Sequence, residues 1–301
     1  MTTANVTRSV VQLLDETPDV DNQHTFEALW SLFSSLRQKI DARFALTLDP
    51  SVEKFQSYSN DQGEGQGTID ALTGPEMDWL IHSWMGTPQS SFTNIHLTGW
   101  LGPHIRAPHL WMAIGTIPDL FVFMDYGPRA DLAVDTAYLD RYYSQVNDQY
   151  MQVLNDPELP SFVSQDLCTR QYVSPTAICL GGIKASPAML ERLSEMAHAH
   201  LDRWLKWVDE AEAVPFSERE ALAKRDLYIR RTIAERDPAN AVATRLYGED
   251  MKNELVRALW GGDRILPPHA HTPMHPQSFT KRPEQGACEL CGEVDPCSQC
   301  T

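Results

Sequence analysis

The sequence predicts an α+β fold in which helices cover one antiparallel sheet. Apolar residues recur at helical spacing before and after a central region, and the central region itself consists of short runs separated by turns. At 301 residues the chain is long enough to bury a core without a disulfide framework. These observations favour a single globular body built around the central strands.

The first helix is predicted over residues 25–43, with Asp21, Asn22 and Thr25 as candidate caps. Its apolar stripe consists of Phe26, Leu29, Trp30, Phe33, Leu36 and Ile40. Residues 57–67 are rich in Ser, Asn, Asp, Gln and Gly and are expected to form a loop.

Strands are predicted over residues 92–98, 109–115 and 120–125. The links between them contain Gly102-Pro103 and Ile117-Pro118-Asp119, which are too short for helical crossovers. The strands should therefore be antiparallel neighbours.

Alternation along these strands separates polar from apolar residues. Asn94 and His96 share one face of the first strand, and His109, Trp111 and Ala113 lie together on one face of the second. We therefore expect one face of the sheet to carry the polar groups.

The rest of the chain is predicted to be mostly helical. A helix is expected over residues 136–154, then one more strand around Ser174-Pro175-Thr176. From Pro187 the helical period returns, and two further helices are expected over 217–235 and 239–260, where Gly261 and Gly262 end the last one.

The charge balance argues against some partners. A formal net charge of -16 repels nucleic acid and anionic membranes. No run approaches the length of a membrane span, and the N-terminus lacks the pattern of a signal peptide. A cytoplasmic protein is expected, with no nucleic-acid or membrane partner.

The cysteines fall into two groups. Cys168 and Cys179 lie in apolar surroundings and are interpreted as buried small residues without chemistry. The last residues carry two Cys-x-x-Cys pairs, a spacing that lets four thiolates converge on one ion: Cys288, Cys291, Cys297 and Cys300. Zinc is expected there in preference to an iron–sulfur centre. We predict one domain over residues 1–264, a Pro/His-rich linker over 265–286 and this metal-binding tail over 287–301.

Several short segments, in shared order, carry a family resemblance. Residues 77–84 read MDWLIHSW and are similar to IDFxLxSW of red chlorophyll catabolite reductase, a member of the ferredoxin-dependent bilin reductase group. Residues 107–109 (APH), 125–132 (DYGPRADL) and 173–177 (VSPTA) resemble APN, DLPxRxDL and FSPTA of the same family.

The resemblance implies an α/β/α sandwich with a central antiparallel sheet. It also implies a pocket for a linear tetrapyrrole between the sheet and the C-terminal helices, and a ferredoxin-like electron donor. Neither a flavin nor a nicotinamide is expected as cofactor. Val173 stands where the family places an apolar residue against the pigment.

The chain departs from the family at its acidic groups. Where members carry a glutamate on the strand after Ala-Pro, this chain has Ala113. The second acidic group of the family corresponds best to Asp237, which is also a candidate helix cap. Because His109 shares the face of Ala113, it is the candidate replacement for the missing acid. We predict His109 and Asp237 as proton donors.

Asn94, His96, Trp111, Ala113 and Val173 are the candidate substrate-binding residues. Each also has a plain structural explanation as part of a half-buried sheet face.

For a ferredoxin-like partner, the candidate contact is the cationic stripe Lys224, Arg225, Arg230 and Arg231, which is equally explained as a solvated helix face.

The sequence thus predicts an oxidoreductase acting on a linear tetrapyrrole or a related conjugated pyrrole or indole compound. Two alternatives stay open. One is a tailoring enzyme of a secondary pathway with a non-bilin substrate, and the other is a non-catalytic pigment-binding or scaffold protein.

Overall fold

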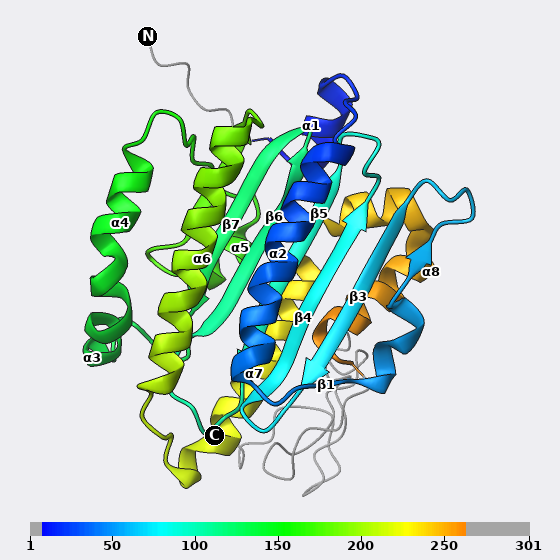
Figure 1. Ribbon diagram of the computed structural model, residues 1–301. Coiled ribbons are helices and arrows are strands. Elements are labelled where there is room, and N and C mark those ends of the chain that lie inside the picture. Colours follow the sequence, from blue (N-terminus) through cyan, green and yellow to red (C-terminus); the bar gives the residue numbers. More distant parts are fainter. Residues whose placement is uncertain (1–7, 263–301) are drawn as a thin grey trace, which may run out of the picture.

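The centre of the molecule is an antiparallel sheet with the strand order β1-β3-β4-β5-β6-β7-β8, and β2 pairs with β3 (Figure 1). The computed structural model describes residues 8–262. Its strands are β1 (Thr47–Leu48), β2 (Tyr58–Ser59), β3 (Gln66–Thr73), β4 (Met77–Gly86), β5 (Thr93–Leu101), β6 (His109–Ile117), β7 (Asp119–Gly127) and β8 (Ile178–Ile183).

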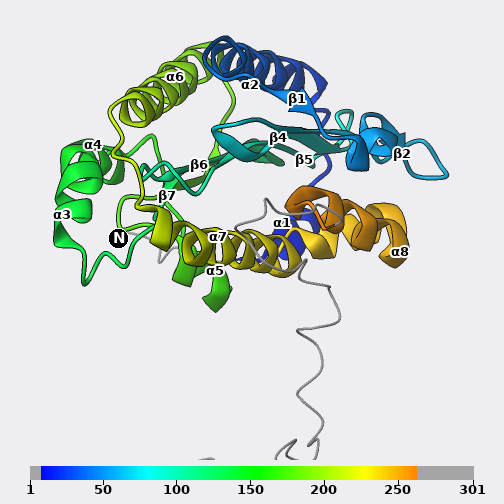
Figure 2. The same cartoon turned by 90° about the horizontal axis from the view of Figure 1, so that it is seen from below.

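Helices cover both faces of the sheet (Figure 2). They are α1 (Val10–Glu16), α2 (Gln23–Arg43), α3 (Thr136–Leu139), α4 (Gln145–Leu154), α5 (Leu167–Tyr172), α6 (Pro187–Asp209), α7 (Phe216–Arg236) and α8 (Asn240–Trp260). Helices α2 and α6 lie over one face, while α1, α5, α7 and α8 lie over the other. The expected α/β/α sandwich with a central antiparallel sheet is confirmed.

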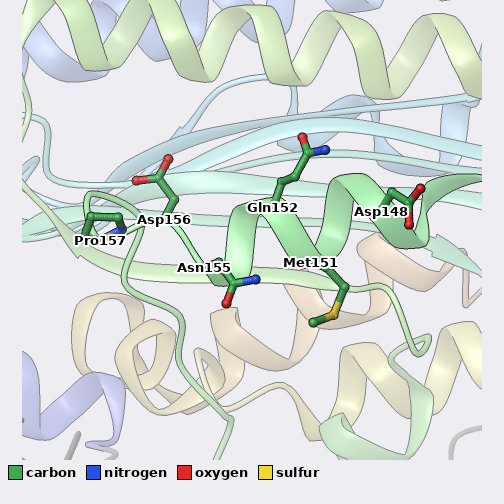
Figure 3. A pocket seen from close by; sticks show the side chains of 6 residues that line it. All are labelled: Asp148, Met151, Gln152, Asn155, Asp156 and Pro157. Carbon is green, nitrogen blue, oxygen red and sulfur yellow. The ribbon is translucent and has the colours of Figure 1, made fainter.

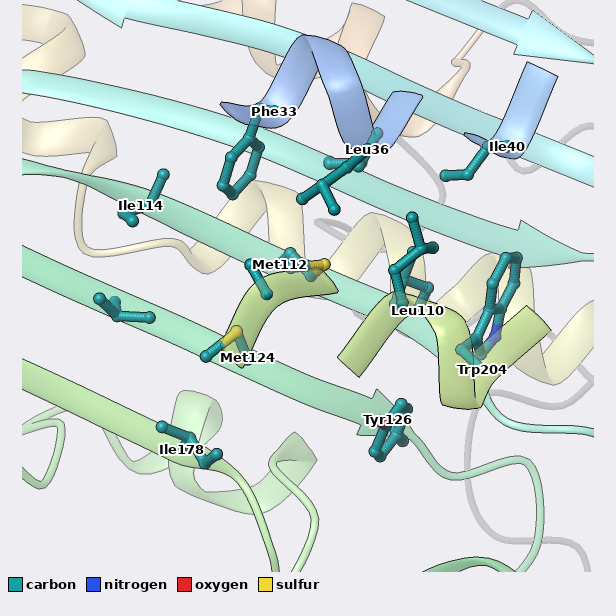
Figure 4. Packing of buried hydrophobic residues seen from close by; sticks show 14 of the residues in the cluster. Phe33, Leu36, Ile40, Leu110, Met112, Ile114, Met124, Tyr126, Ile178 and Trp204 are labelled. Atoms are coloured by element: carbon teal, nitrogen blue, oxygen red, sulfur yellow. The ribbon is translucent and has the colours of Figure 1, made fainter. Parts of the chain in front are cut away.

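The face under α2 and α6 holds the larger apolar core (Figure 4). Alternate residues of β5, β6 and β7 point into it, and Leu97, Leu110 and Met112 are completely buried there. From above, α2 contributes Phe33, Leu36 and Ile40, the stripe that the helical period predicted. This face is closed by apolar packing.

The predicted strands are confirmed as β5, β6 and β7, and each neighbouring pair is antiparallel. The strand expected around Ser174-Pro175-Thr176 is wrong. These residues form a turn, because the backbone N–H of Ser174 donates to the carboxylate of Asp125 at 2.8 Å and Pro175 has no N–H for a ladder. The strand begins at Ile178 instead.

The last helix ends as predicted at Gly261, whose φ of 75° is left-handed. Just before that end, the indole Nε1 of Trp79 on β4 donates to the carbonyl oxygen of Leu259 at 2.9 Å. The end of α8 is thereby tied to the sheet.

No helix within residues 8–262 combines the length and apolar character needed to cross a bilayer. The predicted linker and the cysteine tail both lie outside the described residues.

Candidate functional site

The second face of the sheet, under α7 and α8, is incompletely covered at its centre. One cross-strand row on this face consists of Ser83, His96, Ala113, Phe123 and Cys179. All of these residues except Ser83 are only partly buried. In contrast, Leu97 and Met112, which follow His96 and precede Ala113 in the chain and point to the opposite face, are completely buried. Accessible area therefore remains in the middle of a sheet that is sealed on its other side.

Residues of the flanking rows extend this accessible area. We call the whole accessible area the site patch; its members are His96, Thr98, Ala113, Phe121, Phe123 and Cys179. Asn94 lies beyond His96 toward one strand end, and Trp111 lies opposite Thr98 at the other. The predicted grouping of polar residues on one face is thus present, because the register sets His96 directly opposite Ala113.

His96 and Asp237 interact electrostatically between the two layers. Burial lowers the pKa of the His96 imidazole, and the carboxylate of Asp237 opposes that effect. Asp237 follows the last residue of α7, and its Oδ1 accepts a hydrogen bond from the backbone N–H of Ala239 at 2.8 Å. The sheet and the C-terminal helices thus place an imidazole and a carboxylate within electrostatic range of each other.

His109 belongs to a different cluster, although it shares the face of Trp111 and Ala113. Its Nδ1 accepts from the backbone N–H of Leu101 at 3.0 Å, and its Nε2 lies 3.3 Å from Oδ2 of Asp226 on α7. Burial lowers the pKa of His109 to about 4, against the opposing charge of Asp226, so the ring is neutral near pH 7. Its surroundings are those of a structural histidine.

Asp226 is held by Arg129. The guanidinium Nη2 and Nε of Arg129 donate to Oδ2 of Asp226 at 2.7 and 3.0 Å, and both side chains are buried. Burial raises the pKa of Asp226, but the charge of Arg129 and the contact with His109 outweigh it and lower the value to about 2. The cluster fastens α7 to the start of β6.

Asp125 forms a second buried clamp that sequence reasoning missed. It accepts hydrogen bonds from the backbone N–H of Ser174 at 2.8 Å and from its hydroxyl at 2.5 Å. Burial raises the pKa of Asp125 to about 7 despite these bonds. A signal was available, because Asp125 and Ser174, like Arg129, all lie in the segments that carry the family resemblance.

The remaining predicted residues border the patch or lie apart from it. The ring of Trp111 packs against Gly127, where a Cβ would come within 2.3 Å of Trp111 Cζ2. Val173 is half-buried at the end of α5, next to the Ser174 clamp. Cys168 and Cys179 are partly buried free thiols, and burial raises the pKa of Cys179 to about 12.

The predicted cationic stripe on α7 is only half exposed, because Lys224 is exposed and Arg225 is partly buried whereas the other two residues are buried. Arg230 and Arg231 are 3% and 2% exposed. Arg230 pairs with Asp78 of β4 at 2.8 Å and lies over the rings of Trp79 and Trp100. A helix that packs flat against a sheet turns such side chains inward, where buried charges need partners. The buried pair therefore stabilises the fold, and only Lys224 and Arg225 of the stripe are accessible to an acidic partner.

An open hollow of about 590 Å³ lies elsewhere, along α4 (Figure 3). It is lined by Asp148, Met151, Gln152, Asn155, Asp156 and Pro157. The hollow shares no residue with the site patch. Helix α4 lies at the side of the molecule, away from the centre of the sheet. Within residues 8–262, no group of three or more His, Cys, Asp or Glu side chains is placed to hold a metal ion.

Fold and site together define a helix-covered antiparallel sheet, with an imidazole on the sheet and a carboxylate at its C-terminal helices within electrostatic range of each other. The same architecture occurs in the solved structure of tomato phytochromobilin synthase in complex with biliverdin. The TM-score is 0.68 at 17% sequence identity, over 88% of this chain and 90% of that one. The profile of red chlorophyll catabolite reductase matches residues 28–260, and the chain belongs to that family.

Plant relatives agree with this assignment. The chain is 25% identical over 251 residues to the chloroplastic red chlorophyll catabolite reductase of Arabidopsis thaliana, covering 76% of each chain. It is 27% identical over 248 residues to red chlorophyll catabolite reductase 1 of Oryza sativa subsp. japonica, covering 76% of this chain and 75% of the relative.

Proposed function

We propose that the chain reduces a linear tetrapyrrole bound against the site patch, with His96 and Asp237 handling the protons. The electrostatic interaction between these two side chains, beside the accessible centre of the sheet, is the observation that carries the proposal. Family membership supports the reaction class, and the fold neighbour is a protein solved with biliverdin.

Reduction of one conjugated double bond consumes two electrons and two protons. Burial keeps His96 largely neutral before reaction, since it lowers the pKa of the ring. An electron added to the bound pigment places negative charge beside His96, which favours its protonated form. Asp237 stabilises that imidazolium, which then gives its proton to the pigment.

Ala113 explains why a histidine takes this role. The resemblance places a family glutamate at this position, and the register sets His96 directly across from it. Cross-strand partners lie about 5 Å apart, so an imidazole at His96 reaches the region that a carboxylate at position 113 would reach. We therefore assign the proton donor to His96, while His109 holds α7 in place.

The electrons come from outside the chain in this proposal, and a ferredoxin-like one-electron donor would supply them in two steps. Since Arg230 and Arg231 are buried, they do not contact the donor directly.

The test is turnover of red chlorophyll catabolite and of biliverdin under anaerobic conditions, with reduced ferredoxin as donor. His96→Gln and Asp237→Asn should each lower turnover by roughly a hundredfold. The exposed His24→Ala serves as control. Wild-type rates in both site variants would refute the site, while binding without turnover in the unmodified protein would favour a pigment-binding role. No binding of either pigment would point to a tailoring enzyme with another substrate.

We also propose, from spacing alone, that Cys288, Cys291, Cys297 and Cys300 bind one zinc ion. These residues lie outside the described part of the chain. Elemental analysis after anaerobic purification should find about one zinc per chain. Replacing Cys291 and Cys297 with serine should abolish it, and a metal content unchanged by that replacement would disprove the assignment.

A further inference from the structure

Two buried polar atoms border the site patch without a protein partner. They are Oδ1 of Asn94 and the indole Nε1 of Trp111, and neither makes a hydrogen bond with any residue in 8–262. Both side chains are 6% exposed. A buried donor or acceptor without a partner destabilises a protein, so such groups are rare and call for an explanation.

Two other buried indoles and one other buried amide are paired. The indole Nε1 of Trp79 donates to Leu259, and that of Trp204 donates to the carbonyl oxygen of Pro108 at 2.9 Å. The amide of Asn22 donates to Pro118 at 3.0 Å. Other buried polar atoms without a partner within residues 8–262 include a histidine nitrogen and a tyrosine hydroxyl, but Asn94 and Trp111 carry the two that border the patch on either side of His96.

The two residues that carry the unpaired atoms lie on opposite sides of His96 along the strand direction. Asn94 precedes His96 by two residues on β5, and Trp111 lies opposite Thr98, two residues after His96. At about 3.3 Å per residue, their backbone positions are about 13 Å apart along the strand. Trp111 is also fixed, since its ring lies against Gly127 and 5.2 Å from the ring of Trp100.

We propose that Asn94 and Trp111 recognise opposite ends of the ligand and set its direction across His96. Asn94 Oδ1 accepts from a pyrrole or lactam N–H, and Trp111 Nε1 donates to a lactam carbonyl oxygen. The ligand is therefore a long conjugated molecule with an N–H near one end and a carbonyl oxygen near the other. This assignment rests on the proposed function and specifies its substrate.

Conservative variants should stabilise the free protein and weaken its binding of the ligand. Trp111→Phe and Asn94→Leu remove a buried polar atom that has no protein partner, so the urea midpoint of the free protein should rise. Their dissociation constants for biliverdin, measured by absorbance titration, should increase about tenfold, because each loses one hydrogen bond to the ligand.

Trp79→Phe and Asn22→Leu are the matched controls. They remove paired groups outside the patch, so the urea midpoint should fall while biliverdin affinity stays unchanged. A biliverdin derivative whose lactam groups are blocked as lactim ethers should bind wild-type protein and Trp111→Phe equally well, because the acceptor for Trp111 is gone.

Unchanged biliverdin affinity in Trp111→Phe and Asn94→Leu would overturn this assignment while leaving the proposed function intact. A fall in the stability of both variants would have the same consequence. If the wild-type protein binds neither biliverdin nor red chlorophyll catabolite, the proposed function fails and this assignment fails with it.

Discussion

Replacing Arg129 with methionine tests the buried cluster that holds α7 on the sheet. The substitution keeps side-chain length but removes the charge and the donors that reach Asp226 and the carbonyl oxygens of Gly102 and Ile105. Asp226 is then a buried carboxylate that keeps only a neutral His109 and the half-buried Arg225, whose Nη1 lies 3.3 Å from Oδ1 of Asp226.

The expected loss in unfolding free energy at pH 8 is about 3–5 kcal/mol, the typical effect of removing one partner from a buried ion pair. In the wild type, the pKa of Asp226 is lowered from 3.8 to about 2. Its stabilising contribution is therefore present above pH 4 and is lost as pH falls from 4 toward 2. In Arg129→Met, burial is opposed only by the half-buried Arg225 and raises the pKa of Asp226 above its usual range.

The variant should consequently recover as pH falls. The carboxyl of Asp226 can take up a proton while the wild-type pair is still intact, so the difference between the two proteins should shrink from pH 8 to pH 5.5. Urea unfolding followed by tryptophan fluorescence at both pH values measures the difference. The double variant Arg129→Met with Asp226→Leu should regain most of the loss, because it leaves no unpaired charge.

A loss below about 1 kcal/mol in Arg129→Met would refute the account of this cluster, because that is the range of exposed pairs. A difference from wild type that stays constant between pH 8 and pH 5.5 would show that the loss does not come from the charge of Asp226.

Further predictions concern neighbouring residues. His109→Ala should lower the unfolding free energy by about 2–4 kcal/mol, since it leaves the backbone N–H of Leu101 unpaired. His96→Gln should change the unfolding free energy by less than about 1 kcal/mol, and chemical denaturation of both variants measures the difference. Because the folded state raises the pKa of Asp125 to about 7, stability should fall as pH rises from 4 to 7, and Asp125→Asn should flatten a melting-temperature profile over that range. Gly127→Ala should displace Trp111 and cost about 1–3 kcal/mol, with a changed near-ultraviolet circular dichroism spectrum; an unchanged spectrum would contradict the packing.

Local patterns in the sequence located the long helices and the middle of the sheet, but not β1 to β4. The spacing of apolar residues located α2, α6, α7 and α8, and short links located β5, β6 and β7 as antiparallel neighbours. Alternation also placed Asn94 and His96 on one face, because successive side chains on a strand point to opposite sides. The order of the short resembling segments indicated the family, which the match over residues 28–260 confirms.

Tertiary structure alone decided which groups meet. Alternation fixes the face of His96 and His109 but not the helix residue above each. Only the packing of α7 puts Asp226 beside His109 and brings Asp237 within electrostatic range of His96. The same packing buried Arg230 and Arg231, whose spacing on a helix is compatible with either an inward or an outward face. A pattern within one element reports its own periodicity, whereas a contact between distant elements depends on their register and distance, which no local pattern contains.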